Sequence, residues 1–324
     1  MTTLNDIAKV AHVSVATVSR VLSYDKSMSV SNETRSKIFE LAETLNYTKY
    51  KTKNERVNGT IGLVTWYSRE EELSDLYYLS IRLGIENYLQ QNGFLIQYIS
   101  PQKIDVKSKH LTGVIAIGKF SHQEMQHLSD MYQQIVFIGC NSLKVHRSCV
   151  MTDVECDFQA LLQDALSKFD ASRIFLLTGK ESTNDQTEII QDERVLLFEK
   201  YLKGTTNVYQ QHFTANSGYQ LMTDILDAHD ALPQVIFAGN DAMAIGIIKK
   251  LLEANIKVPE QVKVIGFDNI SIAQYAAVPL TTIDVKTTQM GEMGAKLLLE
   301  NLKATQPLIQ RITVGTELVS RQSY

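Results

Sequence analysis

Residues 4–22 read LNDIAKVAHVSVATVSRVL and contain two short helical patterns. The first pattern places apolar residues at the i, i+3, i+4, i+7 spacing of one helix face: Leu4, Ile7, Ala8 and Ala11. His12 and Val13 interrupt that spacing, and Ser14 is a good N-cap for a second helix over Val15–Leu22. The stretch therefore predicts two helices joined by a tight turn.

A third helical pattern follows a polar loop at residues 23–30. Ser31 is its expected N-cap, as Thr3, with Asp6 three residues later, is the expected cap of the first helix. Two short helices braced by a third predict a helix-turn-helix in residues 1–47. Its second helix would enter the DNA major groove by its N-terminal end.

The outward side chains of the second helix suit that task. Arg20 can pair with guanine O6 and N7, and the small apolar Val15 and Ala16 suit thymine methyl groups. Phosphate contacts are expected from Thr17, Ser19 and Asn32. The alternative is a three-helix structural cap whose Arg20 is only solvated.

The string at residues 4–22 closely resembles the signature of the lactose-repressor family, and SNETR at 31–35 and LNY at 45–47 resemble that family's third helix. The resemblance assigns base reading to Val15, Ala16 and Arg20. It assigns backbone contacts to Thr17, Ser19 and Asn32.

Residues 48–60 are polar and charged, and they predict an exposed linker. The resemblance implies a hinge helix here, with a leucine that wedges into the minor groove. This sequence lacks both that leucine and the usual Pro after the Tyr, so Val57 is the one candidate wedge. Alternatively, the lysines of the linker contact phosphates.

In residues 61–324, short apolar runs alternate with amphipathic helical patterns. Strands are expected at 61–66, 94–99, 114–117, 135–138, 173–177, 235–238 and 263–267. Helices are expected at 79–91, 157–169, 188–202, 218–226, 242–254 and 288–302. This alternation predicts an α/β body of two parallel sheets covered by helices.

In such sheets, ligands bind at the carboxyl ends of the strands. Trp66 and Tyr67 follow the first expected strand, Asn240 follows residues 235–238, and Asp268 follows residues 263–267. Amides and carboxylates beside aromatic rings suit a neutral polyhydroxy ligand. The alternative is that Asn240 and Asp241 only cap a helix and that Asp268 lies in a surface turn.

Three further strings, GNDAMAIG at 239–246, VIGFD at 264–268 and PLTTI at 279–283, resemble the effector domain of the same family. That domain is similar to periplasmic sugar-binding proteins. The resemblance implies one subdomain over residues 61–152 plus 285–312, and another over 153–284 plus the C-terminal tail. It carries ligand roles onto Arg194, Asn240 and Asp268, and a stacking role onto Phe213.

Residues 67–85 and 111–118 resemble the subgroup that controls galactose and β-galactoside operons. This makes galactose or a β-galactoside the expected effector, and Tyr78 an expected pocket residue beside Trp66 and Tyr67. The alternative is that Tyr77 and Tyr78 are core aromatics. The run Glu70–Glu72 is expected to be solvated.

Charge and composition fit this assignment. Residues 1–58 carry a net charge of +3 and the remainder −7, which suits a protein that contacts nucleic acid at one end. The three cysteines lack CxxC spacing and are expected to be reduced thiols in a cytoplasmic protein. No stretch has the roughly 20 apolar residues of a membrane helix. The sequence also lacks P-loop, HExxH and GxSxG motifs.

We therefore expect a homodimeric regulator of transcription that binds a pseudo-palindromic double-stranded operator and is released by a small sugar. It would act as a repressor rather than an enzyme, and it would need no cofactor and no metal. Two alternatives remain at this point: a sugar-binding transport protein, or an enzyme fused to a DNA-binding head.

Overall fold

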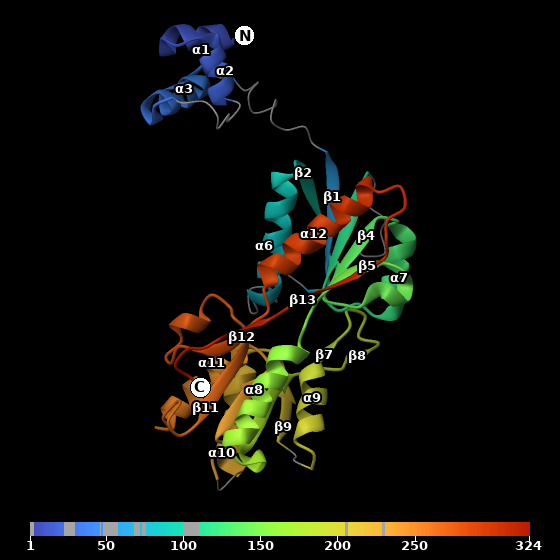
Figure 1. The fold of residues 1–324 in the computed structure, drawn as a ribbon, viewed down its shortest axis with the longest axis vertical. Coiled ribbons are helices and arrows are strands. Elements are labelled where there is room, and N and C mark those ends of the chain that lie inside the picture. The colour runs from blue at the N-terminus through green and yellow to red at the C-terminus, as the bar shows by residue number, and fades with distance from the viewer. Residues whose placement is uncertain are drawn as a thin grey trace. The chain divides into compact units, whose positions relative to one another are not determined.

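The computed structural model divides the chain into two units. Contacts separate Met1–Gly59 from Thr60–Tyr324, and Figure 1 draws both as ribbons. The described residues are 3–22, 30–45, 47, 58–67, 72, 76–99, 110–204, 207–228 and 231–324. Val57 lies outside the described residues, as do most of the expected linker and the side chain of Asn32. Within the described ranges, no helix combines the length and apolar character needed to cross a bilayer.

The described residues of the first unit form three helices: α1 (Leu4–Ala11), α2 (Val15–Leu22) and α3 (Asn32–Thr44). Their expected caps are confirmed. Thr3 and Asp6 form a capping box, Ser14 Oγ accepts the backbone N–H of Thr17 at 3.0 Å, and Ser31 Oγ accepts that of Thr34 at 3.1 Å. Apolar side chains of all three helices share one core, in which Ile7, Val18 and Ile38 are completely buried.

The first sheet of the second unit has the strand order β13-β5-β4-β3-β1-β2. Its strands are β1 (Gly59–Thr65), β2 (Phe94–Ile99), β3 (Gly113–Ile117), β4 (Ile135–Ile138), β5 (Ser148–Thr152) and β13 (Arg311–Val314). Helices α6 (Leu76–Gln91) and α12 (Thr287–Lys303) cover one face, and α7 (His122–Met131) covers the other. Along β3, Ile115 and Ile117 pack toward the first pair of helices, while Val114 packs toward α7.

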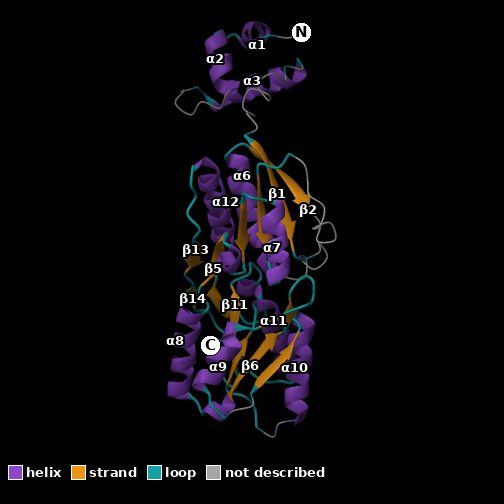
Figure 2. Ribbon diagram, turned by 90° about the vertical axis from the view of Figure 1, so that its right-hand side faces the viewer, coloured by secondary structure: helices purple, strands orange, loops and turns teal. Residues whose placement is uncertain are grey.

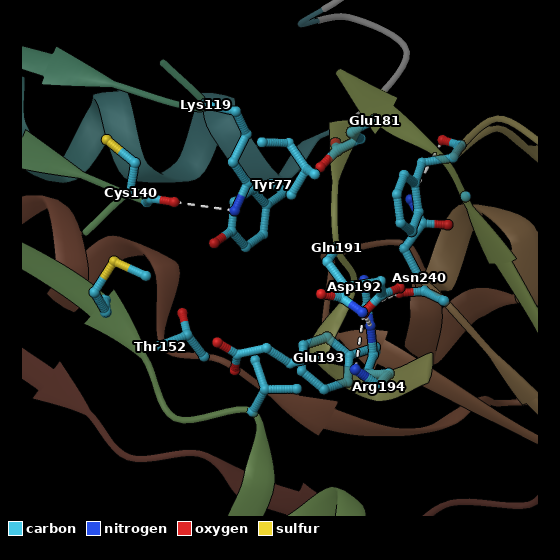
Figure 3. Close-up of a pocket in the computed structure, with 18 of the residues that line it drawn as sticks. Tyr77, Lys119, Cys140, Thr152, Glu181, Gln191, Asp192, Glu193, Arg194 and Asn240 are labelled. Carbon is cyan, nitrogen blue, oxygen red and sulfur yellow. Dashed lines mark hydrogen bonds and ion pairs between the residues drawn. The ribbon is translucent and has the colours of Figure 1, made fainter. Parts of the chain in front are cut away.

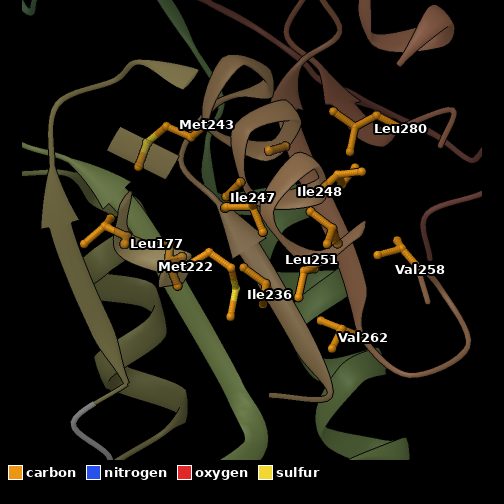
Figure 4. Close-up of a cluster of buried hydrophobic side chains, with 14 of the residues drawn as sticks. Leu177, Met222, Ile236, Met243, Ile247, Ile248, Leu251, Val258, Val262 and Leu280 are labelled. Atoms are coloured by element: carbon orange, nitrogen blue, oxygen red, sulfur yellow. The ribbon is translucent and has the colours of Figure 1, made fainter. Parts of the chain in front are cut away.

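The second sheet has the strand order β14-β12-β11-β10-β6-β9. Its strands are β6 (Ile174–Gly179), β9 (Val208–Gln211), β10 (Val235–Ala238), β11 (Lys263–Asp268), β12 (Thr281–Asp284) and β14 (Glu317–Val319). Helices α8 (Glu155–Lys168) and α9 (Glu193–Tyr201) pack on one face, and α10 (Ala215–Ala228) and α11 (Asp241–Glu253) on the other. Figure 4 shows the core between β10 and α11, where Ile236 and Ile247 are completely buried. Figure 2 shows helices on both faces of the strands.

Glycines let the helix pairs on each sheet approach closely. A Cβ on Gly246 of α11 would lie 1.9 Å from the carbonyl oxygen of Ala215 in α10. A Cβ on Gly291 of α12 would lie 2.0 Å from the carbonyl oxygen of Ile81 in α6. Larger residues at these two positions would force the helices apart.

The chain passes between the two sheets three times, after β5, β12 and β13. The subdomain boundaries therefore fall at residues 152–155, 284–287 and 314–317. The parallel strands of both sheets end near these crossings, so residues that follow them face the space between the subdomains. The two-subdomain α/β architecture is the one that the sequence predicts.

The expected helix over residues 188–202 is too long. Residues 181–190 instead form a hairpin of β7 (Glu181–Ser182) and β8 (Ile189–Ile190), and α9 begins only at Glu193. Asp192 caps that helix by accepting the backbone N–H of Arg194 at 2.9 Å. An aspartate cap of this kind sets the first helical residue.

Candidate functional site

Helix α2 divides its side chains as the sequence predicts. Val18, Val21 and Leu22 are buried in the head core. Val15, Ala16 and Arg20 are exposed, and Thr17 and Ser19 are half-buried. The Thr17 hydroxyl lies 2.8 Å from Ser14 Oγ, so it also helps to hold the first turn of the helix. Five of the seven predicted DNA-contacting residues therefore lie together along one helix.

In the second unit, a cavity of about 320 Å³ lies between the two subdomains. Five of the seven predicted effector residues line this first cavity: Tyr78, Arg194, Phe213, Asn240 and Asp268. Figure 3 shows Tyr77 and Lys119 of the first subdomain across the cavity from Asp192 and Arg194 of the second. A ligand here would contact both subdomains at once.

Arg194 is fixed on three sides at the floor of the first cavity. Its Nε donates to Asp192 Oδ1 at 2.8 Å, and its NH1 donates to the carbonyl oxygen of Gly239. The guanidinium carbon lies 5.3 Å from the centroid of the Phe213 ring and 4.8 Å from that of Phe267. A guanidinium held in this way is preorganised to donate to ligand oxygens.

The Arg194–Asp192 pair keeps its charges although it is buried. Burial opposes the charge on Arg194, but the Asp192 carboxylate outweighs burial and raises the pKa of Arg194. Likewise, burial alone would raise the pKa of Asp192, but the Arg194 charge and the hydroxyl of Thr178, which donates at 2.8 Å, lower it. Arg194 therefore stays protonated and Asp192 stays ionised at physiological pH, so the guanidinium can donate hydrogen bonds while the pair as a whole is neutral.

Asn240 and Asp268 line the same cavity from neighbouring strand ends. Asn240 Oδ1 accepts the backbone N–H of Met243 at 2.9 Å, so it caps α11 in addition to facing the cavity. Asp268 is buried rather than placed in a surface turn, and its φ of 110° is unusual for a residue with a side chain. Backbone strain of this kind is found at functional sites, where the surroundings hold a side chain in place.

Trp66 and Tyr67 do not line the first cavity. They line a second cavity of about 440 Å³, together with Tyr78 and Phe213. Tyr78, Glu181 and Phe213 belong to the walls of both cavities, so the two adjoin. Tyr77 and Tyr78 also contact the core beneath, so they pack as core aromatics and line the first cavity as well, and their contact with an effector stays a prediction.

Comparisons with known proteins give the site its context. A model of the lacI family of bacterial regulatory proteins matches residues 3–49, and a periplasmic binding protein-like domain matches residues 164–324. The HTH-type transcriptional regulator GalR of Streptococcus thermophilus is 35% identical over 330 residues, which span 100% of this chain and 99% of GalR. The chain belongs to the LacI family.

Solved structures show the same fold. A complex of the transcriptional regulator CelR with cellobiose matches with a TM-score of 0.71 at 24% identity, covering 100% of both chains. A lac repressor dimer bound to operator and the anti-inducer ONPF matches with a TM-score of 0.69 at 21% identity, covering 99% of this chain and 98% of that chain. The predicted helix-turn-helix head and two-subdomain α/β body of a LacI-family transcription regulator are thereby confirmed.

Sequence reasoning missed several residues of the first cavity in this LacI-family chain. Lys119 follows β3, and its Nζ donates to the carbonyl oxygen of Gly139 at 3.0 Å. The rule that ligands bind at strand ends would have found Lys119. Glu181 belongs to the hairpin that the sequence did not predict. Asp192 was missed because the sequence analysis placed it inside the helix expected over residues 188–202. In the described part of the chain, no three His, Cys, Asp or Glu side chains cluster as metal ligands.

We expect the free energy of unfolding to depend on pH through Asp241, the neighbour of Asn240. It is completely buried and accepts hydrogen bonds from Thr282 Oγ1 at 2.6 Å and the Ile270 N–H at 2.8 Å. Burial raises its pKa to about 7, from 3.8 in an exposed carboxyl. The folded state therefore binds this proton more tightly than the unfolded state, so its stabilising contribution is complete below about pH 4 and is lost as the pH rises to about 7.

An Asp241→Asn variant cannot titrate at this position. Relative to wild type, its free energy of unfolding should rise by up to about 3 kcal/mol between pH 5 and pH 8. Calorimetric unfolding of both proteins across this range measures the difference. A difference that stays constant with pH would show that Asp241 does not titrate there.

Proposed function

We propose that this protein is a homodimeric repressor whose two copies of α2 read the half-sites of a pseudo-palindromic operator, and that galactose or a β-galactoside releases it. It would act in the cytoplasm, where its DNA partner lies, and would bind the sugar reversibly without converting it. The base-reading residues would be Val15, Ala16 and Arg20.

The observation that carries the sugar assignment is the chemistry of the first cavity. Arg194, Asn240 and Asp268 supply fixed donors and acceptors, and the ring of Phe213 lies beside them. Vicinal hydroxyls need such paired polar groups, and the apolar face of a pyranose stacks on an aromatic ring. A Cβ on Gly179 would lie 2.2 Å from the Phe213 ring, so the absence of a side chain at this position leaves room for the ring.

The position of the cavity supports a link from sugar to DNA. A ligand between the subdomains changes the free energy of their relative arrangement, and each subdomain of a dimer would contact its copy in the partner. Release follows only if the sugar binds more tightly to the arrangement that does not fit the operator. By the same linkage, operator binding would weaken sugar binding by an equal factor.

Asp268→Ala tests the pocket. It should reduce sugar affinity at least about 100-fold, because it removes a buried acceptor from the ligand hydroxyls. Operator affinity without sugar should remain within about twofold of wild type. Calorimetry with the sugar and fluorescence anisotropy with labelled operator measure the two quantities.

Asp227→Ala is the matched control, because Asp227 is exposed at the end of α10. It should respond to sugar as wild type does. If Asp268→Ala still releases operator at the wild-type sugar concentration, the pocket is misplaced. If the sugar is recovered chemically changed, the protein is an enzyme and the proposed function is wrong.

A further inference from the structure

The second cavity has the composition of a sugar subsite. Its walls come from both subdomains: Trp66, Tyr67 and Tyr78 from the first, and residues 180–184, 186 and 212–214 from the second. It has the volume of an ordinary small-molecule site, as the first cavity also has. A single hexose in contact with Arg194 and Asp268 would leave this adjoining volume without a ligand group.

One polar atom of a residue in the wall of the second cavity is unsatisfied. Trp66 Nε1 is buried, and it makes no hydrogen bond within the residues that the structure describes. Leaving a buried donor without a partner costs about 1–3 kcal/mol. Burial and the neighbouring Glu72 carboxylate raise the pKa of Tyr67, so the Tyr67 hydroxyl keeps its proton beside Glu72.

The Trp66 ring is held firmly in place. It lies on Gly118, where a Cβ would come within 1.7 Å of the indole Cδ1 and where φ is +119°. It also packs edge-on against Tyr78, with ring centroids 5.9 Å apart. A rigid indole beside an aromatic pair is a suitable surface for stacking a second pyranose ring.

The opposite wall of the second cavity is the β7–β8 hairpin, and hydrogen bonds tie it to the first subdomain. Asn184 Nδ2 donates to Glu124 Oε1 at 2.6 Å, Ser121 Oγ donates to Asp185 Oδ2 at 2.6 Å, and the His122 N–H donates to Glu188 Oε1 at 3.0 Å. These bonds join the hairpin to the start of α7. The second cavity is therefore already formed in this arrangement of the subdomains.

We propose that the second cavity binds the second ring of a neutral disaccharide whose galactose ring occupies the first cavity. This inference rests on the proposed function and extends it: the effector would be a disaccharide β-galactoside rather than free galactose. Four carboxylates line the first cavity against two cations, which disfavours an anionic ligand such as a sugar phosphate; the carboxylates are those of Glu181, Asp192, Glu193 and Asp268, and the cations are Lys119 and Arg194. Lys180 and His212 would donate to hydroxyls of the second ring.

Calorimetry on the full-length protein tests the subsite with three probes: galactose, methyl β-galactoside and β-1,4-galactobiose. Galactobiose should bind at least about tenfold more tightly than the other two, because only it reaches the second cavity. Trp66 is the one tryptophan of the chain, so its fluorescence should change with galactobiose more than with methyl β-galactoside.

Variants separate the two cavities. Trp66→Phe keeps a ring but offers a smaller surface for stacking, and it should weaken galactobiose binding about fivefold while changing methyl β-galactoside binding less than twofold. Lys180→Ala, at an exposed wall position, should show the same selectivity without a loss of thermal stability. Lys203→Ala, an exposed lysine outside both cavities, should leave all three affinities unchanged.

These measurements distinguish a failure of the second subsite from a failure of the proposed function. Equal affinity for galactobiose and methyl β-galactoside would overturn the second subsite but leave the first cavity intact. Equal weakening of both ligands by Trp66→Phe would also overturn it, as would tighter binding of a galactobiose phosphate. If none of the probes binds or releases operator, the proposed function itself fails.

Discussion

Replacing Arg194 by lysine should abolish the response to sugar while operator binding persists. Lysine keeps the positive charge beside Asp192. Its ammonium group lacks the planar arrangement of N–H donors by which the guanidinium bonds Asp192, Gly239 and a ligand at the same time. We expect sugar affinity to fall by about 100-fold or more, because the ligand hydroxyls that Arg194 would bind are left without hydrogen-bond partners in the lysine variant. Calorimetry with the sugar and anisotropy with operator check the two halves of this result.

Replacing Arg194 by alanine has a different cost. The buried Asp192 carboxylate would lose its partner, which should lower the free energy of unfolding by about 3–5 kcal/mol. Adding Asp192→Asn should recover part of that loss, because the amide removes the uncompensated charge and its oxygen still caps α9. Denaturant unfolding of both variants measures the recovery. A double variant no more stable than Arg194→Ala would mean that the pair does not hold its charges as the structure indicates.

Strands that apolar runs mark were predicted closely from the sequence. The strands at 94–99, 135–138 and 235–238 have the predicted bounds, because continuous or alternating apolar runs mark them. Strands β9, β13 and β14 were missed: they lie at sheet edges, are largely half-exposed, and carry no such run. The inner strands β5 and β12 were missed as well, because serine and threonine residues break up their apolar runs. The β7–β8 hairpin was missed because strands of two residues leave no periodic signal.

Parts of the site that depend on distant contacts could not be predicted. Glu72 was expected to be solvated, but it is buried and its Oε1 lies 2.7 Å from Arg82 Nε. Only the packing of α6 against this residue brings the pair together. Similarly, the strand-end rule identified Trp66 and Asp268, but it could not show that they line different cavities. That division depends on the hairpin, which folds between the subdomains.

Replacing Arg20 by alanine should weaken operator binding at one base step in each half-site. Arg20 is exposed on α2, so the head should keep its fold and its thermal stability. A bidentate arginine–guanine pair contributes about 1–3 kcal/mol of discrimination, so each half-site should lose roughly that amount. Binding assays with a set of single-base operator variants would show the loss concentrated at one position.

Lys9→Ala separates base reading from charge. Lys9 is exposed on α1 and carries the same charge, but it does not lie on the reading helix. Its removal should weaken all operator variants alike and reduce the dependence of affinity on salt, as expected for a phosphate contact. Arg20→Ala should also reduce the salt dependence, but it alone should flatten the preference at one base pair. If the base preferences of Arg20→Ala match those of wild type, Arg20 is not a base-reading residue, and specificity must come from Val15, Ala16 or the shape of the DNA.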